Sequence, residues 1–251
     1  MNSPISISSI PHLPLFFSMF LTIYFTAHFL IFRTWTPKLR PEASSCLISL
    51  AHGTPAVLLA SNALISNPTH TFSSPNTDSQ NTVLEYSIAY FLMDLCHYLI
   101  FNPKDILFIG HHLATLFVFV TCRYLVGHGA YGVLVLLVLA EVTSFFQNVW
   151  TLSNALRAES KVAAQVFDVL SPPFYALYSV VRGFLGPVFV YRMVGFYLSG
   201  EADGVIPRWV WVSWVSVVVS AILVSIVWIW NRWVDLYRER IDVIDKEKKV
   251  I

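Results

Sequence analysis

The sequence predicts an all-α fold, a polytopic bundle of about seven transmembrane helices. Two observations carry this prediction. Of the 251 residues, 56% are hydrophobic and only 12% are charged, whereas a soluble domain carries about 25% charged residues. Several apolar stretches also reach the roughly 20 residues that a helix needs to cross a bilayer. A formal net charge of +1 gives no reason to expect a nucleic-acid partner, so the predicted partners are membrane lipids.

The predicted spans follow one another with short connections, and only the sixth is ambiguous. Pro172-Pro173 and Gly186-Pro187 interrupt it. One kinked span fits this pattern, and so does a re-entrant piece followed by a span, which gives a range of six to eight. Residues 1–11 contain no Lys or Arg, so we expect the first stretch to be a retained helix rather than a signal peptide. The predicted spans are 13–32, 45–65, 83–101, 106–126, 131–152, one within 166–198, and 209–230.

Basic residues are distributed unevenly between alternate connections. With seven spans, one side of the membrane receives only Arg123 and Arg208. The positive-inside rule then places the C-terminus in the cytosol and the N-terminus on the other side. The predicted organisation is an N-terminal span with a basic cytosolic loop (1–43), a transmembrane core (44–233) and a charged cytosolic tail (234–251). The basic residues on the richer side are Arg33, Lys38, Arg40, Lys104, Arg157, Lys161, Arg232, Arg238, Arg240, Lys246, Lys248 and Lys249.

Tryptophans crowd both ends of the last span. Side chains of this type are enriched at the two membrane–water interfaces. We therefore expect them to form an aromatic belt. They are Trp209, Trp211, Trp214, Trp228, Trp230 and Trp233.

Ionisable side chains interrupt the apolar spans, and the adjacent pair His111-His112 is the clearest case. Such groups are costly at membrane depth and tend to face a cavity or the bundle interior, which makes the pair a candidate functional site. Polar residues one turn apart form narrow stripes on four helices, and a bundle satisfies them by facing the stripes together. The predicted cavity is lined by Asp94, His97, His111, His112 and Glu141, with Thr115, Ser144, Asn148 and Arg182 as further candidates for substrate binding.

Imidazole chemistry suggests what such a cavity does. A histidine acts as a general acid or base near neutral pH, or as a nucleophile towards an acyl group when a neighbour holds its tautomer. Asp94 is the candidate for that neighbour. The alternatives are structural: hydrogen bonds between helices for Asp94 and the histidines, a contact with lipid headgroups for the His111-His112 pair, and pairing of Glu141 with Arg182 or with a histidine.

The same residues do not predict a metal site. Only His97, His111 and His112 are close in sequence, and Asp94 and Glu141 would have to complete the ligand set. The count and geometry that a metal requires are not met in this pattern, so we expect no metal.

Three motifs together resemble the TLC domain family. They are residues 90–94 ending in Asp94, then Pro103-Lys104-Asp105, then His111-His112-x-x-Thr115. The histidine-histidine-x-x-threonine core is shared with ceramide synthases, and the resemblance covers about residues 44–230. It implies a membrane bundle and, by position, His111 or His112 as the group that accepts an acyl chain.

The next predicted span departs from the ceramide synthase pattern. Those enzymes continue with His-Asp-x-x-Asp, whereas this chain has no histidine there and places Glu141 and Ser144 at the two acidic positions. This version resembles the less characterised TLCD-like branch rather than a true ceramide synthase.

Three functions follow as hypotheses. The first is a non-catalytic protein that handles membrane lipids or shapes lipid composition. The second is a ceramide-synthase-like N- or O-acyltransferase that uses His111 and His112, with acyl-CoA as co-substrate and no other cofactor. The third is a lipid transporter, suggested by the interrupted sixth stretch. The resemblance implies the endoplasmic reticulum or another membrane of the secretory pathway. The sequence does not define the lipid or the oligomeric state.

Overall fold

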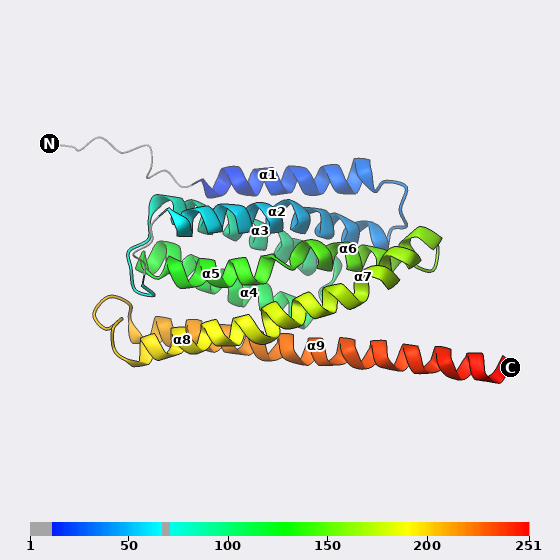
Figure 1. Ribbon diagram of the computed structural model, residues 1–251. Helices are drawn as coiled ribbons and strands as arrows, with labels where there is room; N and C mark the ends of the chain where they lie inside the picture. The colour runs from blue at the N-terminus through cyan, green and yellow to red at the C-terminus, as the bar shows by residue number, and fades with distance from the viewer. Residues whose placement is uncertain (1–11, 67–70, 251) are drawn as a thin grey trace.

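The computed structural model describes residues 12–66 and 71–250, with side chains as far as Arg238 and for Ile241. In this part of the chain every regular element is a helix, as predicted (Figure 1). The prediction that the first stretch is a retained helix and not a signal peptide is based on residues 1–11, which lie outside the described residues. The helices, of which the η segments are π-helical, are α1 (Leu13–Thr26), η2 (Ala27–Ile31), α2 (Leu39–Ile65), α3 (Asp78–Phe101), α4 (Ile106–Val120), η3 (Thr121–Val126), α5 (Ala130–Glu141), α6 (Ser144–Leu156), α7 (Lys161–Val180), η4 (Val181–Leu185), α8 (Gly186–Leu198) and α9 (Arg208–Val250).

Seven helical segments of the described chain are long and apolar enough to cross a membrane. This agrees with the predicted number and identifies a multi-pass integral membrane protein. The segments lie side by side in one bundle, with α1 along one edge and α9 along the opposite edge (Figure 1). They are Leu13–Ile31, Leu39–Ile65, Asp78–Phe101, Ile106–Val126, Ala130–Leu156, Lys161–Leu198 and Arg208–Arg238.

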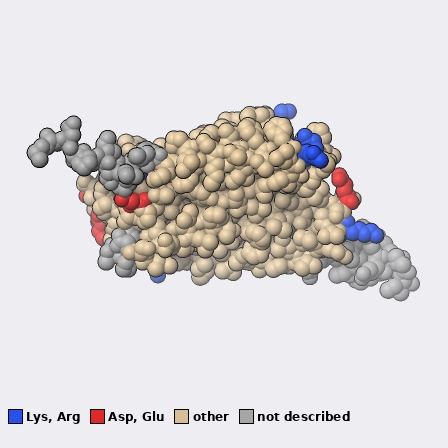
Figure 2. Space-filling model, turned by 90° about the horizontal axis from the view of Figure 1, so that it is seen from above, with Lys and Arg blue, Asp and Glu red and all other residues tan. Residues whose placement is uncertain are grey.

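The surface matches this membrane setting. Figure 2 shows Lys, Arg, Asp and Glu at the two ends of the bundle, and a broad band without them in between. Large apolar side chains on the outside of the helices, such as Leu30, Leu113 and Val169, are more than half exposed. Hydrocarbon is the solvent that such a band requires.

The third span begins earlier than predicted, at Asp78 instead of residue 83. Thr77 and Gln80 form a capping box: the Thr77 Oγ1 accepts from the Gln80 amide, and the Gln80 Oε1 accepts from the Thr77 amide. This pair satisfies backbone donors at the helix start. The polar first turn therefore belongs to the helix, although its composition is typical of a loop.

The fifth span was predicted as continuous, but it is broken between α5 and α6 at Val142 and Thr143. A break frees the carbonyl of Ala140, which needs a donor inside a membrane. The Thr143 Oγ1 donates to that oxygen at 3.2 Å and the Arg182 Nη2 donates to it at 2.7 Å. The break is therefore stable because side chains replace the missing backbone donor.

The sixth region is a single helical segment, Lys161–Leu198, rather than a re-entrant piece followed by a span. Pro172 and Pro173 lie within α7 and do not end it, and the π-helical η4 joins α7 to α8 without a loop. At about 1.5 Å per residue this segment exceeds the roughly 30 Å of bilayer hydrocarbon. It therefore extends beyond the membrane as well as crossing it.

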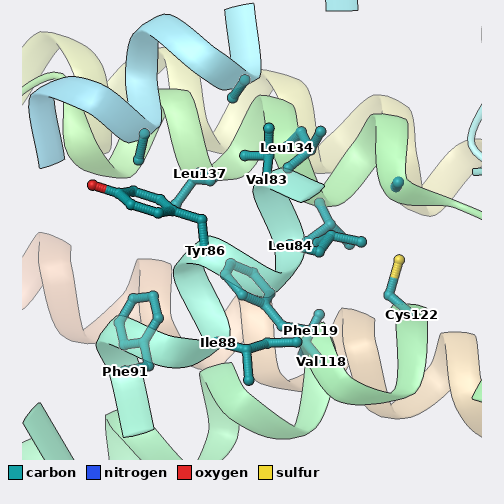
Figure 3. Close-up of a cluster of buried hydrophobic side chains, with 14 of the residues drawn as sticks. Val83, Leu84, Tyr86, Ile88, Phe91, Val118, Phe119, Cys122, Leu134 and Leu137 are labelled. Atoms are coloured by element: carbon teal, nitrogen blue, oxygen red, sulfur yellow. The ribbon is translucent and has the colours of Figure 1, made fainter. Parts of the chain in front are cut away.

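The core of the bundle surrounds α3, the most buried of the spans. Figure 3 shows side chains of α3, α4 and α5 packed together, with Leu84 and Leu134 fully buried among them. A second cluster, Trp150, Phe167, Phe174, Tyr175 and Tyr178 with Trp228 against it, joins α6, α7 and α9. Close packing of this kind holds helices together where lipid provides no hydrophobic drive.

Two of the six tryptophans predicted for an aromatic belt are core residues instead. Trp214 is fully buried, and its Nε1 donates to the Thr121 Oγ1 at 2.8 Å. Trp211 is buried and stacks on Tyr197, with 5.5 Å between the ring centroids. Trp209 and Trp230 are mostly exposed, as an interfacial position requires. The sequence could not separate these roles, because packing and interface select the same side chain.

The start of α1 is held by a buried carboxylate. Glu85 of α3 is 1% exposed; its Oε1 lies 2.7 Å from the Arg123 Nη2, and its Oε2 accepts from the His12 backbone amide at 2.5 Å. One side chain thus joins three parts of the chain at one end of the bundle.

Candidate functional site

Asp94 is the centre of a buried hydrogen-bond network that joins α2, α3 and α4. Its Oδ1 accepts from the Ser45 Oγ at 2.6 Å. Its Oδ2 lies 2.9 Å from the His112 Nε2 and accepts a longer bond of 3.5 Å from the Tyr90 hydroxyl. Asp94 and His112 are 3% and 4% exposed. Each oxygen of a carboxylate deep in the bundle therefore has a partner.

Both ring nitrogens of His112 are committed. The Nδ1 lies 2.8 Å from the Phe108 carbonyl oxygen, and because a carbonyl only accepts, the Nδ1 carries a proton. One further proton lies between the Nε2 and the Asp94 Oδ2, on one atom or the other. His112 has no free lone pair for attack on a substrate, and its geometry is that of a residue that ties helices together.

His111 lies on a different side of α4 from His112. Successive residues of a helix are about 100° apart, and the two rings are nearly perpendicular, with centroids 5.6 Å apart. His111 and Thr115 line a cavity from which His112 is absent. The adjacent pair therefore divides into one residue inside the Asp94 network and one that faces open space.

That cavity has a volume of about 160 Å³, is partly open, and lies between α4, α5, η4 and α9. The cavity has two unlike ends. Because α4 and η4–α8 run opposite to α5 and α9 (Figure 1), residues early in α4 and η4 lie at the same end as residues late in α5 and α9. The ends are about 12 Å apart, the rise from His111 to Phe119 along α4. Its polar end carries His111, Thr115, Glu141, Arg182 and Ser225, and its apolar end carries Val118, Phe119, Val133 and Val217.

Glu141 and Arg182 face this cavity from the break in the fifth span and from η4. Arg182 donates to the Ala140 carbonyl oxygen and lies over the ring of Tyr178, 5.0 Å from its centroid. Among the described ion pairs within 4.0 Å, none joins Glu141 to Arg182. The described residues therefore contain no direct ion pair of Glu141 with Arg182, whereas a histidine, His52, does lie within ion-pair distance of Glu141.

His52 of α2 is not among the residues that the sequence predicts to line the cavity. It is fully buried, and its Nδ1 lies 3.8 Å from the Glu141 Oε2. Gly53 makes this approach possible, because a Cβ there would lie 2.0 Å from the Ser144 Oγ and 2.9 Å from the Glu141 Oε2. The signal in the sequence is a histidine beside a glycine inside a predicted span.

Asn148 connects helices and is not among the residues that line the cavity. Its Nδ2 donates to the Ser49 Oγ and to the Ser144 carbonyl oxygen, both at 2.8 Å. The bond to Ser49 joins α6 to α2 on the C-terminal side of the break, and the bond to Ser144 lies within α6. Ser144 itself is buried beside Glu141.

His97 lies apart from the other predicted site residues. Its Nδ1 is 2.9 Å from the Tyr24 hydroxyl of α1. Both residues line a groove of about 280 Å³ between α1 and α3, which His28 also borders and whose remaining lining is largely apolar. The predicted site is thus distributed over three places: the Asp94 network, the cavity, and this groove.

Metal-binding geometry is absent from the part of the chain that the structure describes, where no three His, Cys, Asp or Glu side chains are grouped to hold an ion. Cys46, Cys96 and Cys122 are free thiols. The groups that the described site offers for chemistry are acids, bases and hydrogen-bonding side chains.

These features define the class of the protein: a polytopic helical membrane protein with ionisable side chains gathered inside its bundle. A family model, the TLC domain, matches residues 42–234. A relative described as a TLC domain-containing protein, from Arabidopsis thaliana, is 62% identical over 234 residues, which cover 92% of each chain. The chain belongs to the TLC domain family, as the resemblance predicted. The relative's description also agrees with a TLCD-like branch. No solved structure matches.

Two helical glycines provide a test of the close approach at Glu141. We expect Gly53→Ala to lower the free energy of unfolding by about 1–3 kcal/mol, because the added methyl group overlaps Ser144 and Glu141. Gly110→Ala is the matched control, since its Cβ would meet no heavy atom within 4 Å, and the substitution should stabilise the helix by up to about 1 kcal/mol. Unfolding of the detergent-solubilised variants measures both. Equal stabilities for the two variants would contradict the packing described.

Proposed function

We propose that the protein handles a membrane lipid by holding one apolar chain in the cavity between α4, α5, η4 and α9. The lipid's polar group would lie at His111, Glu141 and Arg182. The observation that carries this proposal is the division of the cavity into a polar and an apolar end. The volume of about 160 Å³ is below the roughly 300 Å³ of pockets that enclose a whole small molecule. It suits one segment of a chain whose remainder stays in the bilayer.

The free-energy cost of placing charged side chains at the polar end of the cavity supports a role in binding. A charged side chain near the middle of a membrane helix costs about 2.5–3.5 kcal/mol on insertion scales. Glu141 and Arg182 carry this cost without a direct ion pair between them. Asp94, in contrast, has its two oxygens occupied by protein donors. Groups that the fold leaves open to a cavity are the ones available to a ligand.

A second candidate function is acyl transfer through His111. It is favoured by the free ring of His111, since His112 has both nitrogens committed. In that reaction a His111 nitrogen attacks the thioester carbonyl of an acyl-CoA, the carbon–sulfur bond breaks, and coenzyme A leaves as a thiol after taking up a proton. An amine or hydroxyl of a second lipid then receives the acyl group. No feature of the described residues favours transport over binding, because the sixth span is a continuous helix rather than two half-helices.

We also infer the orientation from the uneven distribution of basic residues. The end that holds the α1–α2 and α6–α7 connections would face the cytosol. The membrane we expect is that of the endoplasmic reticulum or a linked secretory compartment, by family resemblance.

Lipid binding is tested with a fatty acid analogue that carries a diazirine on its chain, cross-linked to the protein in nanodiscs. We expect label on peptides of α4, α5 or α9 that line the cavity. Val217→Trp fills the apolar end and should reduce labelling about tenfold, equivalent to a loss of about 1.4 kcal/mol in affinity.

Val219→Trp is the matched control for this experiment. Val219 is 37% exposed on the same helix, outside the cavity lining, and its replacement should leave labelling unchanged. The binding proposal fails if both variants label like the wild type, or if the label lies only outside the lining helices.

Acyl transfer is tested by incubating the purified protein with acyl-CoAs of several chain lengths and measuring its intact mass. If His111 is the acceptor, the wild type gains one acyl group and His111→Gln does not. His28→Gln, which changes a histidine outside this cavity, should behave like the wild type. Absence of any adduct or acylated product with every acyl-CoA would exclude this second candidate and leave the binding proposal intact.

The orientation is tested with an epitope fused to the C-terminus. After selective permeabilisation of the plasma membrane, an antibody should reach the epitope because the basic end lies in the cytosol. An epitope detectable only after internal membranes are dissolved would reverse the orientation.

A further inference from the structure

A group of buried polar atoms lies behind the cavity, between α2 and the break in the fifth span. His52 stacks on Tyr90 with 4.1 Å between ring centroids and 8° between their planes. Its Nε2 lies 3.1 Å from the Ser87 Oγ. Its Nδ1 is buried without a hydrogen-bond partner and lies 3.8 Å from the Glu141 Oε2. The ring is held rigidly with an unpartnered nitrogen directed at a carboxylate.

The space between these groups is part of the fold. Gly53 contributes no side chain, and a Cβ there would meet both Ser144 and Glu141. The Ser144 Oγ is buried as well and has no hydrogen-bond partner of acceptable geometry. Unsatisfied buried polar groups are rare, and here two of them border the same carboxylate. Their convergence indicates a binding site rather than a packing defect.

The His52 tautomer decides where a proton lies between the two groups. If the His52 Nε2 donates to Ser87, the Nδ1 carries only a lone pair, and a proton on Glu141 removes the conflict with the carboxylate lone pairs. If Ser87 donates to the Nε2, the ring proton lies on the Nδ1 and faces Glu141. Both arrangements place one proton between the Nδ1 and Glu141. The separation of 3.8 Å exceeds a hydrogen bond of about 2.7–3.2 Å, but one water molecule with two to four polar partners spans such a distance.

We propose that His52, Ser144 and Glu141 form a proton-binding site that opens to the cavity through Glu141. Glu141 exchanges the proton, and its side chain, 11% exposed, borders both the cavity and the buried cluster. His52 is the positioning residue, which acts through Glu141 and does not touch the cavity. The site changes the charge at the polar end of the cavity by one unit, whichever lipid occupies it.

Other ionisable groups face this site from each neighbouring element. On α3 they are Tyr86, Tyr90 and Asp94; on α4, His111 and His112; and on η4, Arg182. From α1 the neighbour of His52 is the apolar ring of Phe20. The Asp94 Oδ2 already has the His112 Nε2 as its partner at 2.9 Å.

Infrared difference spectroscopy of the full-length protein as a function of pH tests the proposal, because a carboxylic acid and a carboxylate absorb separately. We expect a titrating carboxyl band that disappears in Glu141→Gln. In His52→Phe, which keeps the flat ring against Tyr90, the midpoint of that band should move by about one pH unit or more. In Ser144→Ala it should also move, but by less. A purely structural role of His52 would change stability without moving this midpoint.

The matched control is His28→Phe, which removes a membrane-embedded imidazole that borders the α1–α3 groove instead. Its carboxyl band should titrate like that of the wild type. If His52→Phe does not fold, Ser144→Ala carries the test, since it removes one hydroxyl without a hydrogen-bond partner. The proposal is overturned if Glu141→Gln leaves every titrating band in place, or if the midpoint is unchanged in the folded variants. The measurement requires no lipid, so its outcome is independent of the cross-linking result.

Discussion

The requirement that polar groups find partners inside a bilayer determines most of this structure. Hydrocarbon provides no hydrogen bonds, so each buried donor and acceptor must be matched by protein. Asp94 meets that requirement with Ser45 from α2 and His112 from α4. One carboxylate therefore joins three helices at the centre of the bundle, and Figure 3 shows apolar side chains of two of them, α3 and α4, packed with those of α5.

The same requirement separates structural from functional polar residues. Asp94 and His112 have their hydrogen-bonding atoms occupied by protein, as expected for groups that join helices. Glu141 faces a cavity, and the His52 Nδ1 lies across a gap from its carboxylate without a hydrogen-bond partner. Several described residues contain such an unpartnered atom, but His52 and Ser144 both lie beside Glu141, an arrangement that suits a ligand or a proton.

Composition and spacing were sufficient for the class of fold, because seven long apolar runs in a bilayer leave little choice of secondary structure. The cap at Thr77 and the break after Glu141 were not foreseen, since both depend on side chains that replace backbone partners. For the site, one-turn spacing correctly indicated that Asp94 and His112 lie inside the bundle. It could not show that His97 packs against α1, or that His52 meets Glu141, because such pairings depend on which helices become neighbours.

The contact between Glu85 and the start of α1 has a consequence for biosynthesis. The first helix emerges from the ribosome long before its partners. The Tyr24 hydroxyl and the His12 amide find their hydrogen-bond partners only when α3 has entered the membrane. Asp94 of α3 then lacks its histidine partner until α4 has inserted, and His52 of α2 lacks its neighbour Glu141 until the fifth span has inserted. Each insertion step thus leaves a polar group without a partner until the next helix enters the membrane. The order of synthesis therefore also acts as a checkpoint on assembly.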